Sequence, residues 1–332
     1  MEPAGEVSVF TRDLAATKPQ LCPIAASGLF VSVFPAVVGA SAPFREARDE
    51  LSTLSAKATH WDVAACTDKG VVRPTNEDNF RISPERNLFV LSDGMGGAAN
   101  GEVASALAVE ALFTPSHENG SGAALGKSRA RSEFSPDKNP VTNDLVRAIE
   151  LANRKIHEEA MRDPASRGMG ATIVAAKITG SRLVLAHVGD SRAYLLRANV
   201  LEQLTADHSL VAEQVRHGLM THEQAATSEL QSVLTRALGM EESVEIDADE
   251  IELLPRDSVL LCSDGLTRMV PESEIAGILE QAPNARMAAE RLVQRANECG
   301  GHDNVTVIVI RDSARSKGWF AKFFPSWCSN VV

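Results

Sequence analysis

The 332-residue chain is predicted to be an α+β protein in which two antiparallel β-sheets pack as a central β-sandwich flanked by α-helices, giving α-β-β-α layers. Short apolar runs joined by tight turns such as "TGS" and "GDS" are typical of antiparallel strands. The helical segments form two pairs between groups of strands, unlike the strict alternation of a doubly wound fold. Aromatic residues make up only 5% of the chain, so the core must consist mainly of Val, Leu, Ile and Ala.

The predicted elements begin at Trp61, where the composition of the chain changes. Apolar residues at helical spacing predict the helices, and short apolar runs bounded by turn residues predict the strands. The predicted helices are 102–113, 144–161, 271–281 and 285–299, with helical or irregular structure at 209–239. The predicted strands are 61–66, 87–94, 171–178, 182–189, 191–197, 243–253, 257–265 and 304–312.

Three segments flank or interrupt the predicted domain, which spans residues 60–311. Residues 1–59 are rich in Ala, Ser and Pro, so we expect a poorly ordered N-terminal extension with one candidate helix at 44–57. Residues 114–140 are rich in Gly, Ser and Pro and are expected to form an inserted loop. The tail at 312–332 is basic and aromatic, which suits either docking on a partner or membrane surface, or a flexible terminus.

The charge of the chain indicates where chemistry should lie. The net charge of -11 argues against nucleic acid as a partner, because a phosphate backbone requires a basic surface. Residues 60–310 hold 24 basic and 37 acidic residues, so the acidity is concentrated in the predicted domain. An acidic protein rich in Asp can hold hard cations.

Cysteine usage and hydropathy indicate the compartment. The five cysteines are widely spaced and contain no C-x-x-C pair, which fits reduced thiols in a cytoplasmic protein. Cys66 and Cys262 lie in apolar runs and are expected to be buried. Residues 24–44 are uncharged, but Pro35, Pro43 and several Gly and Ser residues make them a poor spanning helix. We do not expect membrane contact, and this segment and the tail are the two parts of the chain that could make it.

Carboxylates gather at the ends of predicted core strands. The runs "LFVLSDG" and "VLLCSDG" both end in Ser-Asp-Gly, at Asp93 and Asp264. One Asp-Gly pair after a strand is usually only a turn, but two matching endings favour a functional role. Asp303 begins the next apolar strand, and Glu77 and Asp78 lie at a strand edge upstream of Asp93.

These carboxylates would repel one another unless cations or protons neutralised them. Mg²⁺ and Mn²⁺ prefer oxygen ligands, and Gly94 would let its backbone carbonyl approach such an ion closely. Two ions ~3.5–4 Å apart can share a hydroxide that attacks phosphorus in line. Arg73, four residues before Glu77, could present its guanidinium to a phosphate dianion. The histidines are not at zinc-like spacing, so no zinc site is expected.

Eight short motifs occur in one order along the chain. They are "RPTNEDN" (73–79), "SDGMGG" (92–97), "GMGAT" (168–172), "HVGDSRAYL" (187–195), "ADHSLV" (206–211), "LTRALG" (234–239), "SDGL" (263–266) and "HDNVTV" (302–307). Together they resemble the type 2C, metal-dependent (PPM) Ser/Thr protein phosphatases, above all their bacterial branch, over residues 61–311. The resemblance implies the same sandwich fold and a binuclear Mn²⁺ or Mg²⁺ centre.

The resemblance also implies a role for each matching residue. Asp93 would bridge both ions, Glu77 and the carbonyl of Gly94 would bind one ion, and Asp264 and Asp303 would bind the other. Asp190 would bind a third and weaker ion, and Arg73 would bind the substrate phosphate. Asp78 and Asn304 would orient the ligands. Arg73 and Asp93 are therefore the expected catalytic residues. Residues 209–231 resemble the mobile flap beside the active site.

Two residues depart from patterns seen in the family. Met95 follows Gly94, as in bacterial members, where many eukaryotic members carry a histidine thought to be a general acid. Leaving-group protonation would then fall to metal-bound water. Arg268 stands where members commonly carry an acidic or amide residue, which weakens the expectation of a third ion at Asp190.

The implied activity is hydrolysis of phosphoserine and phosphothreonine by direct attack of a metal-bridging hydroxide. No cysteine lies in a phosphate-cradling loop, so no phosphoenzyme is expected. Phosphorylated proteins would be the substrates, a cognate Ser/Thr kinase would be a partner, and the chain is expected to be a cytoplasmic monomer. The alternative is a pseudophosphatase that acts as a binding module. Such a protein is expected to lack a metal ligand, whereas every core position is filled here.

Overall fold

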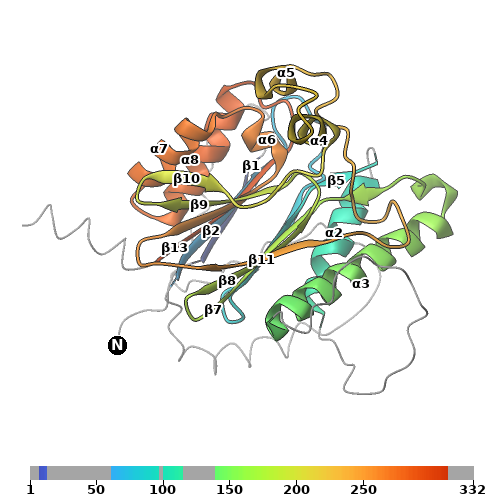
Figure 1. The fold of residues 1–332 in the computed structure, drawn as a ribbon, viewed down its shortest axis with the longest axis horizontal. Helices are drawn as coiled ribbons and strands as arrows, with labels where there is room; N and C mark the ends of the chain where they lie inside the picture. The colour runs from blue at the N-terminus through green and yellow to red at the C-terminus, as the bar shows by residue number, and fades with distance from the viewer. Residues whose placement is uncertain (1–6, 13–60, 97–99, 115–138, 313–332) are drawn as a thin grey trace, which may run out of the picture.

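The computed structural model describes residues 7–12, 61–96, 100–114 and 139–312. Two β-sheets dominate these residues, and a short two-stranded ribbon lies beside them (Figure 1). The first sheet contains, in spatial order, β1 (Val7–Arg12), β2 (Trp61–Asp68), β13 (Val305–Asp312), β12 (Ser258–Cys262), β9 (Arg192–Arg197) and β10 (Val200–Gln203). The second contains β11 (Asp247–Glu252), β8 (Arg182–Val188), β7 (Ile173–Thr179), β4 (Leu88–Ser92) and β3 (Asn79–Ser83), and the ribbon pairs β5 (Gly94–Met95) with β6 (Gly170–Ala171).

Helices cover the outer face of each sheet, so the predicted α-β-β-α layering is confirmed (Figure 1). One helical layer is α2 (Asn100–Phe113) and α3 (Pro140–Arg162), and the other is α7 (Glu272–Gln281) and α8 (Ala285–Glu298). The shorter helices are η1 (Pro164–Ser166), α4 (Leu210–Arg216), α5 (His222–Ala226) and α6 (Asp264–Thr267).

Continuous apolar strands are buried on both faces, as four stacked layers require. In β4, Leu88 and Val90 pack under α2 and α3, whereas Phe89 and Leu91 point between the sheets. In β12, Cys262 packs against the α7–α8 layer and has no exposed surface. The prediction that this cysteine is a small buried hydrophobe is therefore confirmed.

Helix α3 follows from its sequence pattern. Its buried face carries the five apolar residues predicted to form one stripe, which are Leu145, Ile149, Ala152, Ile156 and Ala160. The helix begins four residues earlier than predicted, at Pro140, because Asn139 caps it by accepting a hydrogen bond from the Val141 amide.

One strand was not predicted from the sequence. β1 lies within the N-terminal extension 1–59 and pairs with β2 in parallel, whereas every other pair among the described strands is antiparallel. The candidate helix at 44–57, the segment 24–44, nearly all of the insert 114–140 and the tail beyond Asp312 lie outside the described residues. Within the described part of the chain, no helix has the length and apolar character needed to cross a membrane.

Candidate metal centre

The topology brings the predicted carboxylates to one edge of the sandwich. β12 and β13 are hydrogen-bonded neighbours that run antiparallel, with Cys262 opposite Val307. Asp264 follows the end of β12 and Asp303 precedes the start of β13, so both leave the sheet at the same edge. Asp93 follows the end of β4 in the facing sheet, and β13 and β4 are in contact.

These residues line a cleft of about 320 Å³. Of the predicted site residues, the cleft wall includes Arg73, Glu77, Asp93, Gly94, Asp190, Asp264, Asp303 and Asn304. Asp78 is the one predicted residue that does not line the cleft, and it lies directly behind it. Its Oδ2 accepts hydrogen bonds from Ser263 (2.8 Å) and Thr306 (2.6 Å).

The position of Asp93 is fixed through its backbone. Its amide donates to Thr172 Oγ1 at 2.9 Å, and its carbonyl accepts from the Thr172 amide at 2.8 Å. Thr172 Oγ1 is also 2.7 Å from Ser191 Oγ, which links the β4 end to the loop that carries Asp190. The sequence singled out the motifs around Thr172 and Ser191 but assigned these two residues no role. Ser191 could have been found because it follows Asp190 directly, whereas Thr172 has no acidic neighbour in the sequence.

Asn304 positions the segment that carries Glu77. Its Oδ1 accepts from the Glu77 amide at 2.8 Å, and its Nδ2 donates to the carbonyls of Lys69 (3.0 Å) and Thr75 (2.8 Å). One side chain therefore fixes the loop before β3, next to Asp303.

Glycine at 94 and 101 permits a close approach of the backbone. A side-chain carbon added at Gly94 would lie 2.0 Å from the Gly101 carbonyl oxygen. One added at Gly101 would lie 1.9 Å from Glu77 Oε2. Helix α2 can therefore begin against the site only because both positions lack a side chain.

The cleft holds more negative charge than the protein neutralises. Burial, followed by repulsion from Asp78 and the other carboxylates, raises the pKa of Asp93 well above its usual value. Burial raises the pKa of Asp78 to about 7 and that of Asp190 to about 8. Asp78 Oδ1 and Asp264 Oδ1 are buried without a hydrogen-bond partner. Such a donor set of oxygens fits hard divalent cations, which would satisfy these atoms and remove the repulsion.

Two arginines contact the carboxylates of the cleft. Arg73 Nη2 lies 2.8 Å from Asp303 Oδ2, and its side chain is 54% exposed, so part of the guanidinium remains open to a ligand. Arg268 Nη2 lies 2.5 Å from Asp264 Oδ2 and 3.5 Å from Asp190 Oδ2. The structure places Arg73 at the wall of the cleft, next to Asp303.

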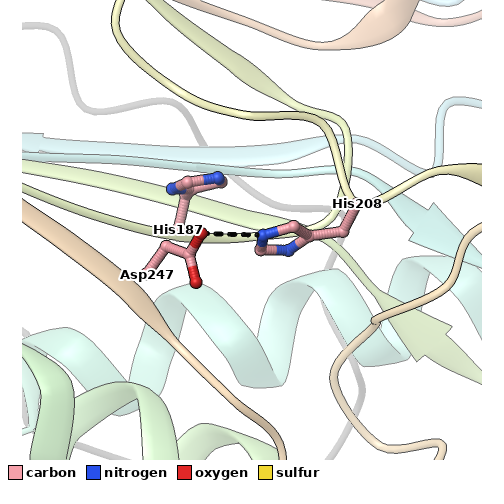
Figure 2. A group of neighbouring side chains, drawn as sticks. All are labelled: His187, His208 and Asp247. Carbon is pink, nitrogen blue, oxygen red and sulfur yellow. Dashed lines mark hydrogen bonds and ion pairs between the residues drawn. The ribbon is translucent and has the colours of Figure 1, made fainter. Parts of the chain in front are cut away.

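A second group of potential ligands lies outside the cleft. His187, His208 and Asp247 have ligand atoms within 4.8 Å of one another, and Figure 2 shows the three side chains converging from separate segments. The rings of His187 and His208 stack with centroids 4.8 Å apart. Spacing along the chain does not reveal this group, because its members come from β8, the loop before α4 and β11.

The hydrogen bonds of this group leave little room for a metal ion. His208 Nδ1 accepts from the Gly189 amide at 3.1 Å, so the ring proton is on Nε2, which faces Asp247 Oδ2 at 3.2 Å. His187 Nε2 donates to the Ala206 carbonyl at 3.0 Å. Arg236 Nη1 lies 2.9 Å from Asp247 Oδ1 and already supplies a positive charge. We interpret the group as structural.

Comparisons with known proteins agree with the geometry of the cleft. The family model "Protein phosphatase 2C" matches residues 73–303. The chain is 38% identical over 255 residues to the Serine/threonine phosphatase stp of Listeria monocytogenes, covering 76% of this chain and 96% of that protein. It is 34% identical over 252 residues to Protein phosphatase PhpP of Streptococcus pneumoniae, covering 75% and 96%.

A solved structure gives the same result. The fold superposes on the catalytic domain of the serine/threonine protein phosphatase PstP, solved in complex with two manganese ions, with a TM-score of 0.64. The two sequences are 36% identical, and the match covers 76% of this chain and 97% of that one. The chain belongs to the protein phosphatase 2C family of phosphoprotein phosphatases, the family that its motifs resemble.

Proposed function

We propose that this protein hydrolyses phosphoserine and phosphothreonine in proteins, with two Mn²⁺ or Mg²⁺ ions held in the acidic cleft. The observation that carries the proposal is the convergence of carboxylates on one cleft, where Asp78 Oδ1 and Asp264 Oδ1 are buried without a hydrogen-bond partner. The binding of two manganese ions by the related PstP domain supports the same assignment.

The side chains that line the cleft support the ligand set that the motifs imply. Asp93, whose carboxylate is repelled by the other acids of the site, would be a ligand of both ions, and Glu77 and the Gly94 carbonyl would be ligands of one of them. Asp264 and Asp303 would hold the other ion. When bound, the two ions supply a hydroxide nucleophile and neutralise charge on the phosphate.

The remaining residues orient the substrate and the ligands. Arg73 is half exposed at the cleft, so its free donors can bind the phosphate oxygens while Asp303 holds one end of the guanidinium. Asp78 and Asn304 fix the strand ends and the loop before β3 through hydrogen bonds. Among the described residues, no histidine lines the cleft, and Met95 follows Gly94, so we assign protonation of the leaving oxygen to water in the cleft.

The partners follow from the reaction. Its substrates are phosphorylated proteins, so a Ser/Thr protein kinase must supply them. The described cysteines are free thiols, which supports the expected cytoplasmic location. We expect a monomer, which light scattering of the full chain would test.

The test is Asp264→Asn, assayed on a phosphoserine peptide in Mn²⁺ and by calorimetric titration with Mn²⁺. Loss of a metal ligand should remove several kcal/mol of transition-state stabilisation, which lowers kcat/KM by roughly a thousand-fold. Asp249→Asn, the same change on the exposed strand β11, is the matched control and should leave both readouts unchanged. Full activity of Asp264→Asn would refute the proposal. If the unmodified protein itself bound no pair of ions, it would be an inert binding module instead of an enzyme.

A further inference from the structure

Arg268 places a positive charge between two carboxylates of the cleft. It ends the short helix α6, one turn after Asp264, and its amide donates to the Asp264 carbonyl at 2.9 Å. Its Nη2 contacts Asp264 Oδ2 at 2.5 Å and lies 3.5 Å from Asp190 Oδ2. The side chain is only 24% exposed, so the guanidinium lies inside the site.

Asp190 and Asp264 come from different segments and would repel each other without a cation. Asp190 lies in the β8–β9 loop, Asp264 follows β12, and both are at most 9% exposed. Two buried carboxylates that both approach one guanidinium nitrogen repel each other unless a positive charge or a proton neutralises one of them. Arg268 supplies that charge covalently, so it does not dissociate as an ion would.

The surroundings of Arg268 distinguish it from Arg73. Arg73 lies at the open side of the cleft and is 54% exposed, as a phosphate-binding residue should be. Arg268 lines both the cleft and a neighbouring pocket of about 650 Å³ beneath α4 and α5. Its Nη2 also lies 3.4 Å from the Gln231 carbonyl, so it contacts the segment that follows α5.

The contact with Arg268 also orients Asp264. Oδ2 is engaged by the guanidinium, whereas Oδ1 is buried without a hydrogen-bond partner. This arrangement leaves Oδ1 for an ion in the cleft, because the other oxygen is already engaged.

We infer that Arg268 is a positioning residue that takes the place of a third cation, so that the centre of this protein binds two divalent ions and none at Asp190. The inference rests on the proposed function and sharpens it. It also accounts for the departure of residue 268 from the acidic or amide residue common in the family.

The test is the number of Mn²⁺ ions bound per chain, measured by calorimetric titration and by anomalous scattering from crystals of the full chain. The unmodified protein should bind two ions and Arg268→Met three, and adding Asp190→Asn to that variant should restore two. Arg216→Met, which removes an arginine from the same pocket without contacting Asp190 or Asp264, is the matched control and should bind two. Arg268→Lys keeps the charge and should also bind two.

Two results would overturn the inference, namely three ions in the unmodified protein or two in folded Arg268→Met. If Arg268→Met does not fold, Asp190→Asn alone decides. If the inference is right, Asp190→Asn should still bind two ions with unchanged affinities. If Asp190 binds a third ion instead, the unmodified protein should bind three ions and Asp190→Asn only two. Failure of the proposed function is a separate outcome, because the unmodified protein would then bind no ions.

Discussion

The acidic cleft and the His187–His208–Asp247 group are both clusters of side chains that can bind metal ions. The protein leaves negative charge unbalanced in the cleft, whereas it supplies hydrogen bonds and a counter-charge to the histidine group. In the cleft, burial and mutual repulsion raise the pKa of Asp93, and two buried oxygens have no partner. In the histidine group, the hydrogen bond from His208 holds the pKa of Asp247 well below its usual range, and the positive charge of Arg236 lowers it further.

The difference shows that proximity alone does not identify a metal site. The histidine group has the tighter set of ligand atoms, yet each of its polar atoms discussed above already has a partner. The cleft has a looser set with unsatisfied charge, which is the property that an ion would remove.

Removing one carboxylate from each cluster should affect activity very differently. Asp93→Asn should lower kcat/KM on a phosphoserine peptide by roughly a thousand-fold, because loss of a bridging ligand disables both ions. Asp247→Asn should stay within about threefold of the unmodified enzyme after correction for the folded fraction, since the group lies outside the cleft. A large loss of kcat in folded Asp247→Asn would show that the histidine group takes part in the reaction.

Mn²⁺ should stabilise the protein only through the cleft. An ion at 100 times its dissociation constant adds about 2.7 kcal/mol to the free energy of unfolding. For a domain of this size that raises the melting temperature by roughly 5–10 °C. The shift should be retained in His187→Gln and should fall sharply in Asp264→Asn. Loss of the shift in His187→Gln instead would place the ion in the histidine group.

Arg236 should contribute more to stability than a surface arginine. Its side chain is 27% exposed and pairs with Asp247, so Arg236→Met leaves a carboxylate short of its counter-charge and should cost about 1–3 kcal/mol of unfolding free energy. Arg182→Met removes a more exposed pair with Glu250 and should cost less than about 1 kcal/mol. Equal losses in denaturant titrations would mean that Asp247 is not held by Arg236.

The sequence alone predicts the acidic cleft but not the histidine group. The carboxylates of the cleft were predictable because Asp93 and Asp264 end apolar strands, and strand ends converge at the edge of a sandwich. Their order along the chain also matches a known family. The fold layers followed in the same way from the short, continuous apolar runs of strands such as β4 and from the apolar stripe of α3.

The histidine group was not predictable, because its contacts depend on the lateral order of strands. His187 lies beside Asp247 only because β11 pairs with β8, and local sequence does not specify which strands become neighbours. The strand β1 escaped prediction for a different reason, since residues 7–12 are a short run within an extension that shows no sustained period. The contact of Arg268 with Asp190 likewise requires two loops to meet at the cleft.

The two clusters should also respond to pH with opposite sign. Burial raises the pKa of Asp78 to about 7 and that of Asp190 to about 8, so the metal-free folded state binds protons more tightly than the unfolded chain. Stability from these groups is present at acid pH and is lost as pH rises from about 4 towards 8. Burial lowers the pKa of His187, so its contribution is present above about 6.5 and is lost as pH falls through the folded-state value.

The histidine effect is the smaller one and can be isolated in Mn²⁺-loaded protein, where bound ions keep the cleft carboxylates ionised. Between pH 6.5 and 5.5 one non-titrating buried histidine costs at most about 1.4 kcal/mol, because the unfolded chain gains a proton that the folded state does not. His187→Gln can still donate to the Ala206 carbonyl but does not titrate, so its stability should fall less over this interval in urea titrations. If both proteins lose the same amount, His187 is not held neutral by the fold. Asp247 cannot account for such a loss, because its pKa is lowered and its contribution to stability fades only below about pH 4.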